Sequence, residues 1–206
     1  MRLEVDPRAL DMVIGRYEPA IQEMLERTLR GGDVAFDIGA NLGYFTLVMA
    51  TTVGAGGRVV SFEPDPQMAA ALTRNIERNV GPSDPVETVI AAMGAATGRV
   101  RFARGWRATR GKVVSEGGDL EVEMTTVDEA SERYGVPRLL KIDVEGAEVD
   151  VLQGATSVLK AEKPAVIVEV HSLELEQRCA RLLQSFGYDC TRTVDRGKKE
   201  TYLIAR

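Results

Sequence analysis

The order of apolar runs along the chain limits its fold more than any other feature of the sequence. From about residue 33, short runs rich in β-branched residues alternate with longer segments of helical spacing, which is the pattern of βαβ units and a parallel sheet. The predicted strands cover residues 34–38, 58–62, 86–90, 139–143 and 165–170. We therefore predict an α/β domain built on a mostly parallel sheet.

The segments between these runs predict helices. Residues 65–79 and 145–160 place apolar side chains three and four positions apart, so that these side chains share one face of a helix. Pro164 prevents the second helix from continuing. A last helix is predicted over residues 173–186, and Gly187 ends it.

Two hairpins complete the predicted fold. Strand-like pieces at 190–194 and 201–205 flank a turn at 196–199, which predicts an antiparallel hairpin near the C-terminus. Glycine, arginine and β-branched residues alternate over 98–123, which predicts a small hairpin inserted between the third and fourth strands.

Length and composition indicate a single globular domain. The 206 residues, 44% of them apolar and 28% charged, are enough for one α/β domain with a substantial core. No apolar run approaches the roughly 20 residues that cross a bilayer, and acidic residues interrupt the N-terminal segment, so we predict a cytoplasmic protein without a membrane partner. Cys179 and Cys190 are too few for a disulfide framework, and we expect both to be thiols.

The charge of the chain argues against a nucleic-acid partner. The net charge is −5, whereas a protein that binds a nucleic-acid backbone usually presents a basic face. One local group of basic residues is the exception: Arg99, Arg101, Arg104, Arg107, Arg110 and Lys112. We interpret this group as a solvated hairpin or loop, with contact to an anionic substrate as the alternative.

The most informative segment is residues 37–46, at the end of the first strand and the start of the next helix. Gly39 and Gly43 allow a tight turn and a close approach of the backbone to a ligand, next to the unpaired N–H groups of a helix N-terminus. Asn41 stands where the dinucleotide fingerprint carries a glycine, so the sequence does not support pyrophosphate binding.

An acidic residue follows the second strand at the position that suits ribose binding. Glu63 lies about twenty residues after Gly43 and is followed by Pro64. A carboxylate at the end of this strand can accept hydrogen bonds from both ribose hydroxyls. The order of strand, glycine loop, helix, strand and acid therefore predicts that Glu63 binds a ribose, with a solvated strand end as the alternative.

The glycine loop, the acid after the second strand and the segment after the fourth strand together resemble the motifs of the FkbM-type methyltransferases. The similarity is carried by residues 34–47 (VAFDIGANLGYFTL), 58–66 (RVVSFEPDP) and 139–155 (LLKIDVEGAEVDVLQGA), and it extends over roughly residues 15–171. The resemblance implies a Rossmann-like methyltransferase fold, with a seven-stranded sheet, helices on both faces and a closing antiparallel hairpin. It also implies a single domain over 1–206, in which residues 1–32 form a helical cap on the core at 33–206.

The resemblance implies S-adenosylmethionine as the cofactor and S-adenosylhomocysteine (SAH) as its product. Asp37, or water held by it, would contact the donor's amino group, and Ala91 and Ala92 would lie near the adenine. Tyr17 and Glu18 would fold over the donor as part of the cap. The residues implied in cofactor binding are Glu18, Asp37, Gly39, Asn41, Gly43, Tyr44, Phe45, Glu63, Pro64, Ala92 and Asp143.

Ionisable residues crowd the end of the fourth predicted strand. Lys141, Asp143, Glu145 and Glu148 lie close together in the chain, and acids this near a cofactor should perturb each other's ionisation. Glu145 and Glu148 are also ordinary residues for the first turn of a helix. Asp143 is the stronger candidate, because ligands of open α/β sheets gather at the carboxyl ends of the strands.

His171 is the single histidine of the chain and follows the fifth predicted strand. We predict that it converges with Asp143 and Glu145 on the acceptor, because an imidazole suits a general base for a hydroxyl. Asp143 is the alternative base. The alternative interpretation of His171 is that it is only a polar residue at the end of a strand. These residues also suit several divalent metals, but their spacing matches no compact metal motif, so no metal site is predicted.

The predicted function is methylation of a hydroxyl oxygen on a small molecule, with sugars, polyketides and phenolic compounds as candidate acceptors. Two alternatives are an NAD-type oxidoreductase, which Asn41 opposes, and a donor-binding module without turnover. A methyltransferase that acts on nucleic-acid amino groups would carry an Asn/Asp-Pro-Pro-aromatic motif after the fourth strand. This chain has Asp143-Val144-Glu145-Gly146 there.

Overall fold

A seven-stranded sheet forms the centre of the molecule. The structure is a computed structural model that describes residues 17–81, 85–105, 111–194 and 200–206. The strands of this main sheet are β1 (Val34–Ile38), β2 (Arg58–Phe62), β3 (Val86–Val89), β8 (Leu139–Ile142), β9 (Ala165–Val170), β10 (Cys190–Val194) and β11 (Thr201–Ala205). All five predicted strands are therefore confirmed, two of them ending one residue early.

The strand order confirms the predicted fold class. The order is β10-β11-β9-β8-β1-β2-β3, and every neighbouring pair is parallel except the two that involve β11. The C-terminal hairpin is present as the antiparallel pair β10 and β11. The turn predicted at 196–199 lies outside the described residues.

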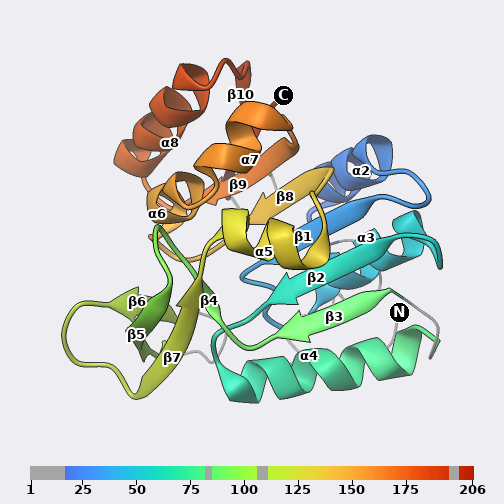
Figure 1. Cartoon of the computed structure of the whole chain (residues 1–206), viewed down its shortest axis with the longest axis horizontal. Coiled ribbons are helices and arrows are strands. Elements are labelled where there is room, and N and C mark those ends of the chain that lie inside the picture. The colour runs from blue at the N-terminus through green and yellow to red at the C-terminus, as the bar shows by residue number, and fades with distance from the viewer. Residues whose placement is uncertain (1–16, 82–84, 106–110, 195–199) are drawn as a thin grey trace.

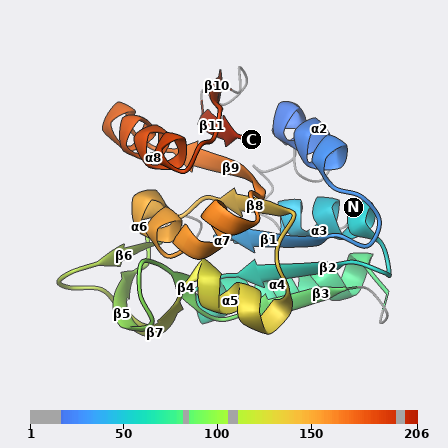
Figure 2. The ribbon, with the colours of Figure 1, turned by 45° about the horizontal axis from the view of Figure 1, so that its top comes forward.

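Helices cover both faces of the main sheet because successive strand residues point to opposite sides. They are α2 (Pro19–Thr28), α3 (Tyr44–Val53), α4 (Pro66–Asn79), α5 (Val127–Tyr134), α6 (Glu148–Gln153), α7 (Thr156–Ala161) and α8 (Leu173–Ser185). Ala35 and Val59 pack with α2 and α3, whereas Phe36 and Val60 pack with α5 to α8. Figures 1 and 2 show α7 in front of the main sheet.

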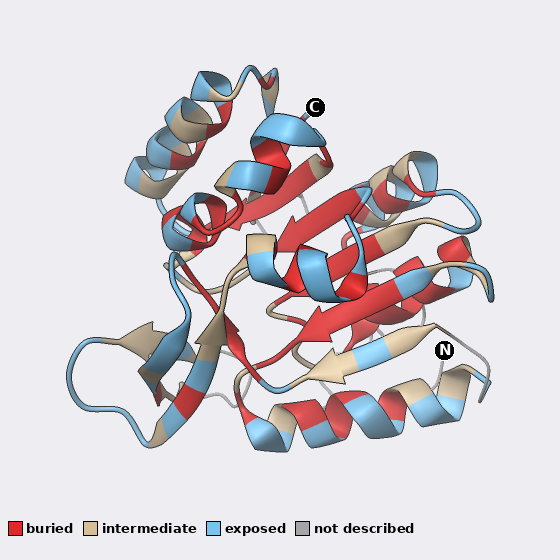
Figure 3. Ribbon diagram, in the orientation of Figure 1, coloured by how far each residue is buried: buried red, intermediate tan, exposed pale blue. Residues whose placement is uncertain are grey.

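The alternation buries most of the central strands on both faces. Figure 3 shows β1, β2, β8 and β9 as largely buried, while exposed residues gather on the outer faces of the helices. Helix α3 is buried almost throughout, because its other side is covered by α2 through Ile21 and Leu25. Cys179 and Cys190 are both free thiols, as predicted.

The helix predicted over 145–160 is in fact two short helices. Helix α6 ends at Gln153, and α7 begins at Thr156 after a turn at Gly154. The chain turns here because the Gly154 backbone lies against another segment: a Cβ on Gly154 would be only 2.0 Å from the carbonyl oxygen of Gly94. Spacing alone predicted one helix because the apolar positions continue in phase across the turn.

The insertion predicted as a small hairpin is larger than expected. It forms a second sheet with strand order β4-β7-β5-β6, made of β4 (Ala92–Met93), β5 (Gly98–Ala103), β6 (Lys112–Val114) and β7 (Leu120–Thr125). The two-residue strand β4 pairs parallel with β7, a contact that no local pattern indicates. In Figure 1 this sheet lies beyond the carboxyl ends of β2 and β3.

The contact between Gly154 and Gly94 generates a prediction about stability. Gly154→Ala should lower the free energy of unfolding by about 1–3 kcal/mol, because the new Cβ overlaps a backbone carbonyl that cannot rotate away. Thermal or denaturant unfolding measures the change. Gly56→Ala is the matched control, since the nearest atom to its Cβ is 3.9 Å away. Equal stability of the two variants would contradict the prediction.

Candidate functional site

The carboxyl ends of the parallel strands meet at one edge of the main sheet. Backbone hydrogen bonds continue beyond the strands: Asp143 N donates to Ile38 O (2.9 Å), and Glu63 N donates to Val89 O (3.1 Å). The segments that follow β1, β2, β3 and β8 are therefore held side by side. This is the edge at which open α/β sheets bind ligands.

The glycine loop after β1 is shaped by contacts within the protein. Gly39 has φ +81°, and a Cβ there would lie 1.8 Å from the carbonyl oxygen of Asp143. Gly43 has φ +86°, and its Cβ would meet Leu72 of α4 at 2.2 Å. The two glycines thus allow the loop to pack against β8 and α4, in addition to any ligand that approaches it.

Glu63 fastens this loop from the end of β2. Its Oε2 accepts a hydrogen bond from Asn41 N (2.9 Å), and its Oε1 accepts one from Asp65 N (2.9 Å). Asn41 has φ +52°, a left-handed conformation that asparagine tolerates better than most residues. A carboxylate offers about four acceptor positions, so two remain for a ligand. Burial raises the pKa of Glu63 to about 7 despite the two N–H donors.

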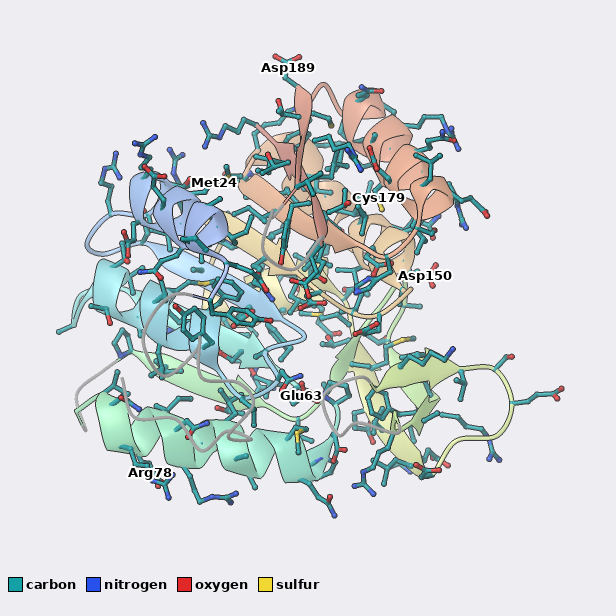
Figure 4. All side chains as sticks on the ribbon, turned by 180° about the vertical axis from the view of Figure 1, so that it is seen from behind. Met24, Glu63, Arg78, Asp150, Cys179 and Asp189 are labelled. Atoms are coloured by element: carbon teal, nitrogen blue, oxygen red, sulfur yellow. The ribbon has the colours of Figure 1, made fainter. Side chains whose placement is uncertain are left out.

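A cavity surrounds this carboxylate. The segments that follow the main-sheet strands contribute Gly39, Asn41, Glu63, Pro64, Ala91, Asp143 and Glu145 to its lining. The second sheet contributes Ala92, Phe102 and Val113, together with Gly111 just before β6. Figure 4 shows Glu63 between the main sheet and the second sheet. The insertion therefore closes one side of the site.

An ion pair joins the second sheet to the cavity. Arg104 Nε and Nη2 donate to the two carboxylate oxygens of Asp65 at 2.7 and 3.0 Å, and Asp65 is the N-cap of α4. This bidentate contact lowers the pKa of Asp65 although burial opposes it. The interpretation of the basic group as solvated is thus wrong for Arg104 and confirmed for Arg99, which is exposed and pairs with Glu121 and Glu123. Arg107 and Arg110 lie outside the described residues.

A buried ion pair lies beneath the loop. Lys141 Nζ is 3.6 Å from Asp37 Oδ1 and 3.4 Å from Asp143 Oδ2, and the Lys141 and Asp37 side chains are 3% and 1% exposed. Burial lowers the pKa of Lys141, but the charges of Asp143 and Asp37 outweigh it, and the pKa rises. Asp37 also accepts from Thr46 Oγ1 (2.7 Å). The Asp37 side chain is therefore enclosed beneath the loop, and its contact with the donor's amino group, directly or through water, stays a prediction.

Tyr44 and Phe45 also lie away from the described lining of the cavity. Tyr17 packs on both rings, with centroids 5.2 and 5.8 Å apart, and Tyr44 Oη donates to Gln22 Oε1 (3.0 Å). Tyr44 and Phe45 thus join α2 and the preceding residue Tyr17 to α3, and their place at the donor stays a prediction. Gly43, at the start of α3, is likewise outside that lining.

Glu18 joins a different group of acids. It is buried at the N-cap of α2, where Tyr202 Oη donates to its Oε2. Tyr202 Oη also contacts Glu169 Oε2 (3.1 Å). One hydroxyl hydrogen thus serves two buried carboxylates, and burial raises the pKa of Glu169 to about 8 and that of Glu18 to about 7. The expected cap over the donor stays a prediction for Tyr17 and Glu18. Residues 1–16 lie outside the described part of the chain.

His171 lies at the centre of the remaining predicted site residues. Its Nε2 is 3.8 Å from Asp143 Oδ1, 3.5 Å from Glu145 Oε2 and 3.5 Å from Glu169 Oε1. The structure thus brings Asp143, Glu145 and His171 together at the ends of β8 and β9. Lys141 lies on the other side of Asp143, engaged in the buried ion pair.

Glu148 orients the histidine from behind. It is fully buried in α6, and its Oε1 is 2.9 Å from His171 Nδ1. Burial lowers the pKa of His171, but the Glu148 hydrogen bond and the charges of Asp143, Glu145 and Glu169 raise it to about 9. Such an imidazole holds a proton at neutral pH, so in this arrangement it pairs with the surrounding carboxylates and is not a free base.

A second cavity opens on the far side of this cluster. It is lined by Glu169, Val170, His171, Ser172, Leu173, Glu176, Arg192, Glu200 and Thr201. Asp143 and Glu145 line the first cavity, and His171 and Glu169 line the second. The acidic cluster therefore forms the boundary between two cavities.

Sequence reasoning named Glu148 only as one of the acids after the fourth strand, and it missed other residues of the site. Glu148 also lies four residues before Leu152 and so shares the apolar face of its helix. Glu169 gave a signal as an acid inside a buried strand. Asn75 of α4, which donates to Leu42 O (2.9 Å) and holds the loop, gave one because it shares the apolar face of the helix predicted over 65–79. Tyr202 gave none, because its partners are distant in sequence.

A comparison with protein families finds one match over most of the chain. The model described as "Methyltransferase FkbM domain" matches residues 37–190. A hexuronic acid methyltransferase of Haloferax volcanii is 31% identical over 160 residues, which are 76% of this chain and 64% of that protein. The chain thus spans less than two thirds of this curated relative.

Solved structures share the fold at low sequence identity. The methyltransferase FkbM of Methylobacillus flagellatus KT has a TM-score of 0.68 at 18% identity, over 86% of this chain and 44% of that one. An O-methyltransferase of Bacillus cereus, solved in complex with SAH, has a TM-score of 0.54 at 15% identity, over 100% of this chain and 83% of that one. The Rossmann-like methyltransferase fold is therefore confirmed.

The buried ion pair generates a prediction about stability. Lys141→Met should lower the free energy of unfolding by about 3–5 kcal/mol, because it leaves Asp37 charged and buried without a cation. Denaturant unfolding at pH 7 measures the change. Adding Asp37→Asn to Lys141→Met should recover part of the loss.

Lys112→Met serves as the control, because Lys112 is exposed on β6. We expect a change within about 0.5 kcal/mol for it. A Lys141→Met variant as stable as this control would show that the ion pair does not hold the strand ends together.

Proposed function

Because the chain belongs to the FkbM methyltransferase family, we propose that it transfers a methyl group from S-adenosylmethionine to a hydroxyl oxygen of a small molecule. The observation that carries this proposal is the cavity at the strand ends, built around the buried carboxylate of Glu63. Its two unused acceptor positions suit the two hydroxyls of a ribose.

The cavity suggests how the donor lies. The adenine would occupy the end beside Ala91 and Ala92, where small side chains leave room, and the ribose would lie on Glu63. The methionine part would then extend over the loop at Gly39 toward Asp143. This direction brings the sulfonium to the acidic cluster, whose negative charge favours a cation.

S-adenosylmethionine as the cofactor is supported by the family and by the fold. The family model names a methyltransferase, and the Bacillus cereus neighbour was solved with SAH, the demethylated product of this donor. A nicotinamide dinucleotide fits less well, because the Asn41 N–H that would face a pyrophosphate donates to Glu63 instead. A donor-binding module without turnover would share the same cavity, so activity separates it from an enzyme.

We place the acceptor in the second cavity, across the cluster from the donor. In-line transfer needs the acceptor oxygen about 3–3.5 Å from the methyl carbon, on the side opposite the sulfur. Asp143 and Glu145 line the donor cavity at this boundary and are placed to take the hydroxyl proton. Because the Haloferax volcanii relative is named for hexuronic acid, sugars and sugar acids are the first acceptors to test.

Among the described residues, no helix combines the length and the apolar character needed to cross a bilayer. The proposed acceptor is a small molecule.

Donor binding should depend on pH through Glu63. Ribose hydroxyls donate to the ionised carboxylate, whose pKa burial raises to about 7, so binding must displace a proton below that pH. The dissociation constant of S-adenosylmethionine should therefore decrease as the pH rises from 5.5 to 8. Calorimetry in buffers of different ionisation enthalpy measures the affinity and the released proton.

Glu63→Gln should bind the donor at least 10-fold more weakly and lose this pH dependence, since each charge-assisted hydrogen bond is worth roughly 1.5–3 kcal/mol. Glu87→Gln, on the exposed side of β3, is the control and should bind as the wild type does. Unchanged affinity in Glu63→Gln would remove Glu63 from the donor site.

Turnover tests the proposed reaction directly. SAH release should be measured with panels of sugars, sugar acids, polyketides and phenols, and mass spectrometry should identify the methylated oxygen. We expect turnover with at least one hydroxylated acceptor. Donor binding without turnover on any panel would favour the binding module, and methylation at nitrogen or carbon would contradict the proposed oxygen acceptor.

A further inference from the structure

Two neighbouring strands present three metal-ligating side chains at the boundary between the cavities. Asp143 follows β8, Glu169 lies near the end of β9 and His171 follows β9, and each offers a ligand atom within 4.8 Å of the others. We propose that Asp143, Glu169 and His171 bind a divalent cation, and that this cation holds the acceptor oxygen. The role in holding the acceptor rests on the proposed function; the cation site does not.

The distances fit a shared ion. Two ligands that each lie about 2.1 Å from one ion are separated by about 3.0–3.4 Å in octahedral or tetrahedral geometry. His171 Nε2 is 3.5 Å from Glu169 Oε1 and 3.8 Å from Asp143 Oδ1. The ligand atoms of Asp143 and Glu169 lie within 4.8 Å of each other, so small side-chain movements that bring the three groups closer together would close the site around an ion.

The imidazole is oriented as a ligand. Glu148 Oε1 accepts from Nδ1 of His171 at 2.9 Å, which directs Nε2 toward the carboxylates of Asp143 and Glu169. A metal-binding histidine characteristically donates its other ring N–H to a carboxylate, which fixes the tautomer. Because Glu148 is fully buried, it cannot rotate to another partner in solvent.

Glu169 is oriented in the same way. Tyr202 Oη contacts its Oε2 at 3.1 Å, so Oε1 is the oxygen that faces His171. Glu18 lies behind this contact with only 2% exposure. Buried carboxyl groups thus gather on the inner side of the site, and a cation at the cluster would stabilise their ionised forms.

The neighbouring lysine does not occupy the proposed ion position. Lys141 Nζ lies between Asp37 and Asp143, at 3.6 and 3.4 Å, and both contacts are on the loop side of the cluster. Asp143 Oδ1, the oxygen nearest His171, is the other oxygen of that carboxylate. A divalent ion at Oδ1 is therefore compatible with the ion pair at Oδ2.

The cluster leaves room for an exchangeable ligand. The side chains of Asp143 and His171 are 27% and 26% exposed, whereas that of Glu169 is 10% exposed. Three protein ligands and an open side are typical of a catalytic metal, as opposed to a closed structural one. Acceptors that offer two adjacent oxygens, such as a vicinal diol or a hydroxy acid, would bind best, because both oxygens can reach one ion.

The cation would also explain how an acidic acceptor enters an acidic site. Two carboxylates and an imidazole suit Mn²⁺ or Mg²⁺ better than a soft metal. A hydroxyl bound to such an ion loses its proton more easily. The proton passes to Glu145, the oxygen attacks the methyl carbon, the carbon–sulfur bond breaks, and the products are a methyl ether and the uncharged thioether SAH.

Direct binding of Mn²⁺ tests the site independently of activity. The full chain, freed of metal by chelation, is titrated with Mn²⁺ and the free ion is followed by electron paramagnetic resonance. We expect one bound ion per chain, displaced by Mg²⁺. Glu169→Gln and Asp143→Asn should weaken binding at least 10-fold, and Glu148→Gln should weaken it 10- to 100-fold by releasing the histidine.

Asp150→Asn is the matched control, because Asp150 is an exposed acid on α6 and should not change Mn²⁺ binding. Circular dichroism shows that each variant is folded, and S-adenosylmethionine binding adds a second check for Glu169→Gln and Glu148→Gln, which do not line the donor cavity. With an accepted substrate, chelation should reduce turnover at least 10-fold, and Mg²⁺ should restore it.

The outcomes separate the two proposals. A folded chain that binds S-adenosylmethionine but no Mn²⁺ at millimolar concentration overturns the cation site and leaves the proposed function standing. Mn²⁺ binding that Glu169→Gln and Asp143→Asn leave unchanged also overturns it. Mn²⁺ binding lost in these variants, without methyl transfer to any acceptor, supports the cation site and refutes the proposed function.

Discussion

The buried ion pair of Lys141 with Asp37 and Asp143 is the interaction on which the rest of the site depends. Asp37 lies near the end of β1 and Asp143 directly follows β8, and without a cation between them their repulsion would oppose the parallel pairing of these two strands. Lys141 lies within β8, so the charge that holds the strand ends together is part of the sheet. The loop after β1 can then pack on Asp143, at a distance that only Gly39 permits.

The parts of the fold that local patterns control were predictable from the sequence. The central strands are buried on both faces, so their apolar runs were visible, and the last helix has a serine cap and an apolar face. The break at Gly154 and the strand β4 were not predictable, because each depends on a contact with a distant segment. Long-range contacts override the local pattern there.

The site shows the same difference between features that local patterns predict and features that depend on distant contacts. The convergence of Asp143, Glu145 and His171 follows from the order of the strands, which the βαβ pattern indicates. The roles of individual residues do not follow from the strand order, because they depend on how deeply each side chain is buried. Asp37 and Glu63 both lie at strand ends, yet the loop covers Asp37 and leaves Glu63 facing the cavity. Glu148 and Tyr202 act through other side chains, and spacing carries no information about such contacts.

The distribution of charge across the site favours binding of the charged donor over its uncharged product. The donor carries a sulfonium, which the acids beside Asp143 attract, whereas the thioether product is uncharged and loses this attraction once the methyl group has left. The same acids would repel a negatively charged acceptor, and a bound divalent cation would reverse that repulsion only on the His171 side. The two substrates would thus be drawn to opposite sides of one cluster, which is the arrangement that in-line transfer between them requires.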